Sequence, residues 1–218
     1  MDYDSLKADR DAKRKNGIYR GIGIASFIEV TNPSAMFYGV GGARISAQDG
    51  ATMRLDAKGN VFVSTGAPYG GGTWGSRAAG IGGEAVAQAG RALREQILVA
   101  AGAMLQEDAA TLDIRGGVVV DADTGNERIG LDEIGRICYY RPDTLPDGFQ
   151  AELVATRHYV PRKFPFAFTN GVQGSYLEID IETGFIKLLN HWCIEDCGTV
   201  INPLLVDGQV HGGIAQGV

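Results

Sequence analysis

A glycine-rich run in the middle of the chain has residue types that could bind an anion or a cofactor. Residues 70–75, Gly-Gly-Gly-Thr-Trp-Gly, fit the pattern G-x-G-x-x-G, and Ser76 and Arg77 follow directly. Glycines let a ligand approach the backbone, and the free N–H groups at a helix start bind phosphate oxygens. The run therefore predicts an anion site at a helix N-terminus, with a tight turn without a ligand as the alternative.

Two common nucleotide-binding folds are excluded by the residues that follow these glycines. A dinucleotide-binding fold needs a second strand with an acidic residue about 20 positions later. Here that position, near Glu95, falls inside a predicted helix. A P-loop needs a Lys-Ser or Lys-Thr pair after the glycines, and none is present there.

The other reactive side chains form no catalytic or metal-binding pattern. Cys193 and Cys197 have no second cysteine pair, so packing thiols are predicted rather than a zinc site. The histidines at 158, 191 and 211 are scattered along the chain. Acidic residues at 180, 182, 195 and 196 are typical of solvated strands and turns. Residue types alone therefore predict no catalytic residue and no metal ligand.

A second run of small residues, Gly-Gln-Val-His-Gly-Gly-Ile-Ala-Gln-Gly at 208–217, lies in a predicted helix. Small residues at helical spacing allow another backbone or a flat ligand to come close. Gln209 and Gln216 offer both hydrogen-bond donors and acceptors. Close helix packing is the alternative, and the residue types do not separate the two.

The elements that would position these runs are strands mixed with a few helices. A charged helix is predicted over residues 4–15, and strands at about 18–29, 36–47, 51–56 and 60–65, with a turn at 48–50. The Ala-rich stretch 85–105 has apolar residues at helical spacing and predicts the longest helix. The glycine-rich run is expected to open this helix.

The second half of the chain continues this mixture. It predicts a hairpin around residues 116–117, a short helix from Leu131, a strand at 151–160 and a final helix from Asn202. A strong hairpin is predicted at 171–195, and its first arm alternates between Tyr176, Glu178 and Asp180 on one face and Leu177, Ile179 and Ile181 on the other.

Hairpin-joined strands with a long helix predict an α+β fold. We expect a lead-in helix at 1–16, a first α+β lobe with the glycine-rich run at 17–140, and the start of a second lobe at 150–218. The last predicted helix reaches Val218 without a cap, so the chain is expected to be a truncated fragment.

Composition narrows the class of protein. The 218 residues carry 20 basic and 26 acidic side chains, and the net charge of −6 with no long basic block argues against nucleic acid as a partner. The longest apolar run, 97–105, is too short to cross a membrane, and the polar N-terminus is no secretion signal. Three cysteines do not form a disulfide framework. A cytoplasmic protein is expected.

Three separated motifs together resemble the molybdenum-binding large subunit of the xanthine dehydrogenase/aldehyde oxidase family, the molybdenum hydroxylases. They are Gly-Ile-Gly-Ile-Ala at 21–25, Tyr-Gly-Gly-Gly-Thr-Trp-Gly-Ser-Arg at 69–77, and Asp-Cys-Gly-Thr-Val-Ile-Asn-Pro at 196–203 with the small-residue run that follows. The resemblance is greatest to bacterial members similar to carbon monoxide dehydrogenase and isoquinoline oxidoreductase. It implies the α+β architecture of the family's second molybdopterin-binding region.

The resemblance also implies a chemistry. The family holds molybdenum on a pterin dithiolene, usually as the cytosine dinucleotide in bacteria, and hydroxylates an aldehyde or an N-heterocycle with oxygen from water. Iron–sulfur centres and FAD on partner subunits take the electrons. The cofactor-binding residues carried over are Gly72, Thr73, Gly75, Ser76, Arg77 and Gln209. The loop would hold the phosphate or the pterin portion, and Gln209 would bond the cofactor near the metal.

Two departures from the family pattern limit these expectations. A Gln-Gly-Gln-Gly-His type loop with a following helix and strand is missing between Gly66 and Ala67, and the family's catalytic glutamate would lie beyond Val218. We therefore expect a chain that is inactive alone and works in an oligomer with iron–sulfur and FAD subunits. The alternatives are a degenerate fragment acting as a binding or assembly module, and a free-standing phosphate or nucleotide binder.

Overall fold

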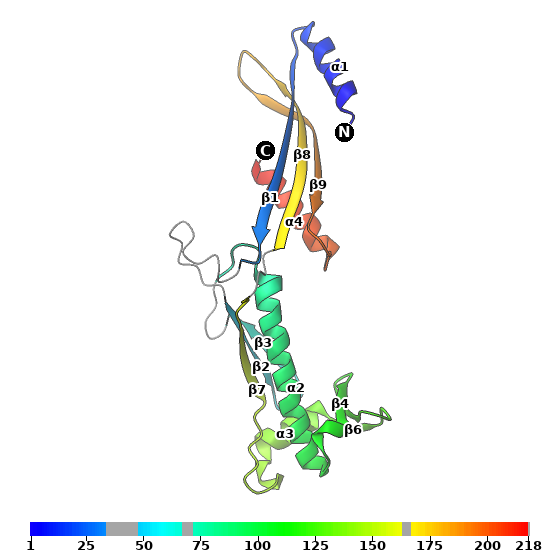
Figure 1. The fold of residues 1–218 in the computed structure, drawn as a ribbon, viewed down its shortest axis with the longest axis vertical. Helices are drawn as coiled ribbons and strands as arrows, with labels where there is room; N and C mark the ends of the chain where they lie inside the picture. The colour runs from blue at the N-terminus through cyan, green and yellow to red at the C-terminus, as the bar shows by residue number, and fades with distance from the viewer. Residues whose placement is uncertain (34–47, 67–71, 163–166, 218) are drawn as a thin grey trace. The chain divides into compact units, whose positions relative to one another are not determined.

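The computed structural model describes residues 1–33, 48–66, 72–162 and 167–217, which belong to two compact units (Figure 1). One unit combines Met1–Thr31 with Ala167–Val218, and the other is Asn32–Phe166. The described strands form three antiparallel three-stranded sheets, and helices accompany the sheets in both units. The predicted α+β fold class is confirmed.

The second unit is inserted into the sequence of the first, which therefore consists of two separate segments. The lobes predicted at 17–140 and 150–218 were each a continuous segment. The reason for the difference is long-range strand pairing. The strand β1 (Tyr19–Thr31) pairs over its whole length with β8 (Ala167–Ile179). The strand β7 (Val154–Tyr159) pairs with β2 (Asp49–Leu55) in the other unit. The predicted strand at 36–47 lies outside the described residues.

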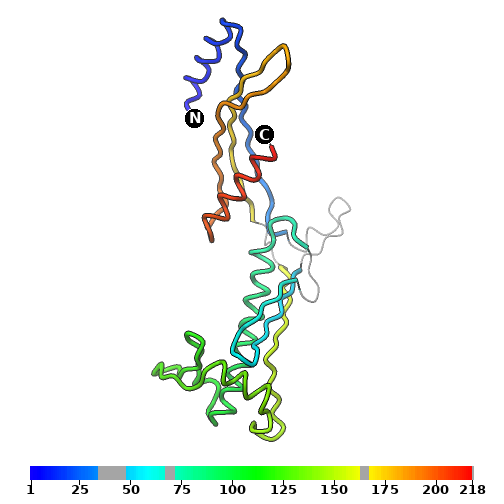
Figure 2. The backbone as a smooth tube through the Cα atoms, turned by 180° about the vertical axis from the view of Figure 1, so that it is seen from behind, coloured from blue at the N-terminus to red at the C-terminus, as the bar shows by residue number. Residues whose placement is uncertain are grey.

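The first unit is built on the sheet β1-β8-β9, in which β9 (Ile186–Asp196) completes the predicted hairpin. The helix α4 (Pro203–Gly217) begins one residue after the predicted start at Asn202 and crosses one face of this sheet (Figure 1 and Figure 2). No side chain of α4 among the described residues is fully buried.

The helix α1 (Tyr3–Arg14) is tied to the same sheet by polar contacts. Arg20 Nη1 lies 2.5 Å from Asp9 Oδ2, and Arg20 Nε lies 2.9 Å from Glu178 Oε2. The Tyr176 hydroxyl donates to Asp9 Oδ2 at 2.5 Å, and only 4% of Tyr176 is exposed. At this point α1 covers the face of β8 that carries Tyr176 and Glu178. The Asp9 carboxylate of α1 accepts the hydrogen bond of the buried Tyr176 hydroxyl.

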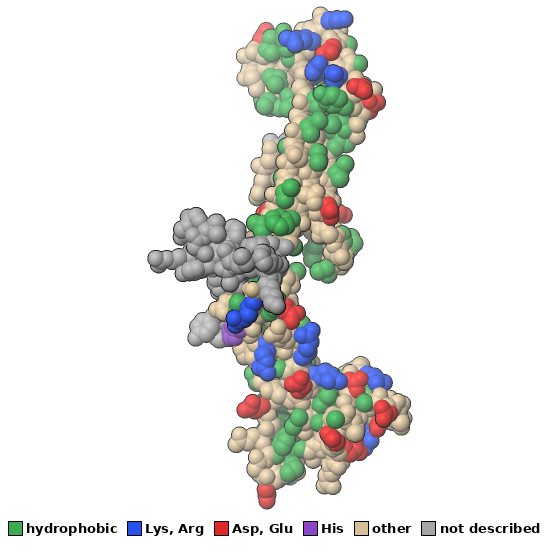
Figure 3. All heavy atoms as spheres, viewed as in Figure 1, with side chains coloured by type: hydrophobic (Ala, Val, Ile, Leu, Met, Phe, Trp, Pro, Cys, Tyr) green, Lys and Arg blue, Asp and Glu red, His purple; other side chains and the backbone are tan. Residues whose placement is uncertain are grey.

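Away from α1, the same sheet exposes apolar side chains, as Figure 3 shows along the strands. The strand register places five of them on one face: Ile24, Ile28, Phe168, Val172 and Ile194.

The second unit packs the long helix α2 (Gly83–Leu105) on the sheet β3-β2-β7, where β3 is Val61–Thr65. Ala51 and Leu55 of β2 are fully buried, whereas Arg54 beside Leu55 is exposed. They meet the apolar face of α2, whose buried residues recur at helical spacing: Ala85, Ala89, Ala92, Leu93, Ile97, Ala100 and Ala101. This confirms the helix predicted at 85–105.

A smaller sheet completes the core of this unit. The strands β4 (Leu112–Arg115), β5 (Val118–Asp121) and β6 (Glu127–Gly130) lead into α3 (Leu131–Tyr140). Short helical turns, η4 (Ala109–Thr111) and η5 (Pro142–Thr144), connect the elements. The hairpin β4–β5 turns at residues 116–117, as predicted.

Candidate cofactor-binding site

A cavity of about 650 Å³ in the second unit lies where the glycine-rich loop meets the start of β2 and the start of α2. Its volume is within the usual range of small-molecule sites, about 300–1,000 Å³. The described residues that line it are Asp49, Thr65, Gly66, Gly72, Thr73, Arg77, Ala78, Gly82, Gly83 and Val86. The structure thus brings Gly72, Thr73 and Arg77, three of the predicted site residues, to one pocket.

The backbone of the loop adopts left-handed conformations at three positions within the described residues 72–77. The φ angles are +85° at Gly72, +59° at Gly75 and +50° at Ser76. Glycine adopts this region without steric cost, whereas Ser76 must be held there by its surroundings. The loop leads into a π-helical turn, η3 (Ala78–Gly82), and α2 begins only at Gly83. The predicted position of the loop before the longest helix is confirmed, with this turn between them.

Arg77 anchors the loop to the beginning of β2. Only 1% of its side chain is exposed, and Nη2 donates to the Gln48 carbonyl and lies 3.8 Å from Asp49 Oδ2. The guanidinium also lies over the Trp74 ring, 5.2 Å from its centroid. A buried charge is stable only with such partners. Arg77 therefore fixes the loop as well as lining the pocket.

Close packing explains the glycines around Arg77. A Cβ on Gly75 would lie 3.0 Å from Pro33, and one on Gly80 would lie 2.3 Å from Asn32 Oδ1. The Asn32 N–H donates to the Gly75 carbonyl at 2.9 Å. The segments at 32–33 and 48–49 form a platform under the loop, and side chains at positions 75 and 80 would clash with residues 32–33.

Sequence reasoning missed this platform. Residues 48–50 were expected to form a turn, but Asp49 and Gly50 are the first residues of β2. Asn32 has a left-handed φ of +52°, which its sequence neighbours do not reveal. The pairs Asn32-Pro33 and Asp49-Gly50 are turn signals. They do not indicate which loop packs against them.

The remaining predicted residues lie apart from the pocket lining. Ser76 is exposed within the loop, next to Arg77. Gln209 is exposed on α4, which belongs to the other unit. Their contacts with a cofactor stay predictions.

The pocket fits a polar cofactor better than a metal held by protein side chains. Glycines at its rim leave room for a ligand at the backbone, and Thr65, Thr73, Asp49 and Arg77 supply donors and acceptors. Among the described residues, no group of three or more His, Cys, Asp or Glu side chains could hold a metal ion. A pterin that brings its own dithiolene ligands needs no such group.

Comparison with known families identifies this region. The family described as the molybdopterin cofactor-binding domain matches residues 64–218, which include the loop, α2 and α4. The chain belongs to this family. The resemblance to molybdenum hydroxylase large subunits, drawn above from three motifs, is confirmed.

Several relatives of this chain are named as large or molybdenum-binding subunits of oxidoreductases. The nicotine 6-hydroxylase large subunit of Paenarthrobacter nicotinovorans is 28% identical over 254 residues, covering 100% of this chain and 31% of the relative. The carbon monoxide dehydrogenase large chain of Hydrogenophaga pseudoflava is 26% identical over 258 residues, with 100% and 31% covered. The chain spans about a third of the length of the curated relatives it matches.

Solved structures agree with this assignment. Quinoline 2-oxidoreductase from Pseudomonas putida 86 superposes with a TM-score of 0.73 at 28% identity, covering 98% of this chain and 31% of that chain. A copper- and molybdenum-containing carbon monoxide dehydrogenase superposes with a TM-score of 0.70 at 26% identity, covering 97% of this chain and 31% of that chain.

The alignment also bears on the missing segment. The match to nicotine 6-hydroxylase extends over 254 residues, whereas this chain has 218, so the relative contains additional residues inside the aligned region. Their position after Gly66 stays a prediction. Within the part of the chain that the structure describes, no helix has the length and apolar character needed to span a membrane.

Proposed function

We propose that this chain forms part of the cofactor site of a molybdenum hydroxylase large subunit, and that the pocket beside the glycine-rich loop contacts the cofactor. The observation that carries the proposal is the meeting of Gly72, Thr73 and Arg77 at one pocket, inside the region that matches the molybdopterin-binding family. When bound, the molybdenum group supplies the hydroxylation chemistry. The residues of this chain bind and orient its organic portion.

The role of each residue follows from its place. Gly72 and Gly75 let the cofactor approach the backbone, and Thr73 offers a hydroxyl at the pocket wall. Arg77 holds the loop end and places positive charge beside the pocket. Ser76 is proposed to contact the cofactor from the same loop. Gln209 is proposed to hydrogen-bond the cofactor from α4.

The whole enzyme is proposed to carry the cytosine dinucleotide form of the cofactor, and to work as an oligomer with iron–sulfur and FAD subunits in the cytoplasm. Its substrate is proposed to be an aldehyde or an N-heterocycle. Two relatives, named nicotine 6-hydroxylase and quinoline 2-oxidoreductase, favour the N-heterocycle. Catalysis belongs to the assembled enzyme, because this chain corresponds to 31% of those relatives.

The second candidate is a degenerate fragment that acts as a binding or assembly module without catalysis. It is favoured by the residues that the relatives have and this chain lacks within the aligned region. If Ser76→Ala and Gln209→Ala change neither the stability of the chain nor its retention of any ligand, the cofactor surface is vestigial.

The deciding experiment is to purify the chain from a host that makes the cofactor, and to measure molybdenum and acid-released cytidine monophosphate. We expect both in amounts equimolar with the chain. Arg77→Lys loses the planar guanidinium fork and should lose both. Arg94→Lys is the matched control, because Arg94 is a half-exposed arginine on α2 that pairs with Asp113 away from the pocket. A folded wild-type chain that contains neither molybdenum nor cytidine monophosphate would refute the proposal.

A further inference from the structure

The pocket wall contains one acidic and one basic side chain whose arrangement indicates which part of the cofactor it takes. Arg77 Nη2 and Asp49 Oδ2 are 3.8 Å apart, and the two side chains are 1% and 15% exposed. Among the described lining residues, these are the charged ones. The inference below rests on the proposed function and concerns the same site.

The charge balance disfavours a phosphate at this wall. The formal charges of Asp49 and Arg77 cancel, and Arg77 already donates to the Gln48 carbonyl. A phosphate that approached Arg77 would lie close to the Asp49 carboxylate, and like charges a few ångströms apart repel strongly in a half-buried site. The anion site expected from the glycine-rich run is therefore not centred on Arg77.

The hydrogen-bonding capacity of Asp49 points to a different group. Its Oδ1 accepts the Gly50 N–H at 2.9 Å. Its Oδ2 is too far from Arg77 for a hydrogen bond, so this oxygen keeps lone pairs for a ligand. A carboxylate oxygen accepts hydrogen bonds and donates none. An exocyclic amino group supplies the matching donor, and carboxylates accept hydrogen bonds from the amino group of cytosine in this way.

We propose that Asp49 binds the aminopyrimidine edge of the cofactor, accepting a hydrogen bond from the exocyclic amino group. The cofactor offers this edge twice, in its pterin and in its cytosine. The phosphates then lie elsewhere along the loop. Asp49 is a ligand-binding residue that the sequence motifs did not contain.

The test uses the sign of one substitution. Asp49→Asn keeps the shape of the side chain and removes its charge. If Asp49 accepts from an amino group, a charge-assisted hydrogen bond becomes a neutral one, and binding weakens about five- to tenfold. If a phosphate lies there, removing the carboxylate relieves repulsion, and binding becomes tighter. Asp49→Glu keeps the charge but moves it. This variant should weaken binding of the aminopyrimidine without strengthening binding of a phosphate.

Binding is measured by calorimetry with free probes: cytidine, uridine, a 6-substituted pterin and inorganic pyrophosphate. Uridine has a carbonyl in place of the amino group, so we expect it to bind more weakly than cytidine. Whichever of cytidine and the pterin binds saturably and is weakened by Asp49→Asn identifies the source of the edge. Asp113→Asn is the control, because it breaks the pair with Arg94 outside the pocket and should leave every probe unaffected. Melting temperatures check that the variants fold.

Three results would overturn the inference: pyrophosphate that binds more tightly to Asp49→Asn while cytidine and the pterin are unchanged, equal affinity for cytidine and uridine with no pterin binding, or no saturable binding of any probe. Molybdenum retained by the chain purified from the cofactor-producing host distinguishes a failure of the inference about Asp49 from a failure of the proposed function. If the wild type and Asp49→Asn retain equal molybdenum through the same dialysis, the role of Asp49 fails and the proposed function stands. A wild type without molybdenum contradicts the proposed function instead.

Discussion

Gly135→Ala sets helix propensity against packing, and the structure predicts that packing dominates. Gly135 is a buried residue inside α3, where alanine is intrinsically more stable than glycine by about 0.5–1 kcal/mol. However, a Cβ at this position would lie 2.2 Å from the Asp56 carbonyl oxygen and 3.2 Å from the Ala57 Cα. These are backbone atoms, so α3 has to move away from the turn between β2 and β3.

The size of the effect follows from what that movement disturbs. Overpacking costs about 1–3 kcal/mol. The Tyr139 hydroxyl, which donates to the Leu55 carbonyl at 2.8 Å, would lose a hydrogen bond of about 1 kcal/mol. After subtraction of the propensity gain, we expect the free energy of unfolding to fall by about 2 kcal/mol, and the melting temperature by roughly 4–8 °C. Urea unfolding followed by circular dichroism measures this change in the free energy of unfolding.

Gly83→Ala is the matched control for this prediction. Gly83 is also helical, but among the described atoms its Cβ would meet just the Ala78 carbonyl oxygen at 3.9 Å, an ordinary contact. This variant should be as stable as the wild type or more stable. If Gly135→Ala also matches or exceeds the wild type, α3 does not pack on the 56–57 backbone as described, and the reasoning is refuted.

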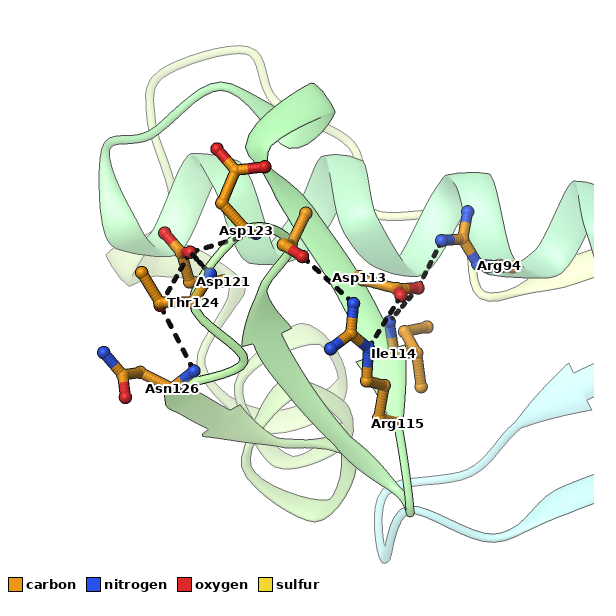
Figure 4. A network of polar contacts seen from close by, with 9 residues as sticks. Arg94, Asp113, Ile114, Arg115, Asp121, Asp123, Thr124 and Asn126 are labelled. Carbon is orange, nitrogen blue, oxygen red and sulfur yellow. Dashed lines mark hydrogen bonds and ion pairs between the residues drawn. The ribbon is translucent and has the colours of Figure 1, made fainter.

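Three further predictions concern other contacts. Hydrogen bonds from Arg94, then from the Ile114 N–H and from Arg115, lower the pKa of Asp113 from 3.8 to about 2 (Figure 4). Because its folded pKa is below its unfolded value, the stabilisation is present above pH 4 and is lost as the pH falls toward 2; urea midpoints of Asp113→Asn should lack that part of the acid dependence. Tyr176→Phe removes the 2.5 Å hydrogen bond to Asp9 and should lower stability by about 1–3 kcal/mol, with faster amide exchange in α1 as the specific sign; unchanged exchange there would contradict it. Gly80→Ala displaces the Asn32 side chain from beneath the loop, so amide exchange at residues 72–77 should accelerate and cofactor retention should fall, whereas protection equal to the wild type would show that Asn32 moves freely.

The local elements of the fold could be predicted because their signals are local. The apolar residues of α2 at helical spacing and the hairpin predicted at 171–195 each lie within a single stretch of sequence, and both elements form as expected. The pairing of β1 with β8 could not be predicted, because nothing in the sequence around Thr31 indicates that it pairs with Ala167. The burial of Tyr176 is a similar case, since it depends on Asp9 of a distant helix.

The candidate site divides in the same way. Gly72, Thr73 and Arg77 were found because the loop motif resembles a family motif, and they do line one pocket. Asp49 reaches that pocket only because Arg77 and Gly82 pack against the start of β2. Such a residue has no sequence signal of its own, since its role arises from tertiary contact.

The interleaving of the two units has a consequence for synthesis on the ribosome. The strand β1 emerges early, but its partner β8 begins only at Ala167, after the whole of the second unit. At translation rates of about 5–20 residues per second, β1 waits on the order of ten seconds for its partner. During that interval its apolar residues Ile24 and Ile28 have no strand beside them, while the second unit, with the pocket, can already fold. The nascent chain therefore offers a folded pocket before the first unit exists.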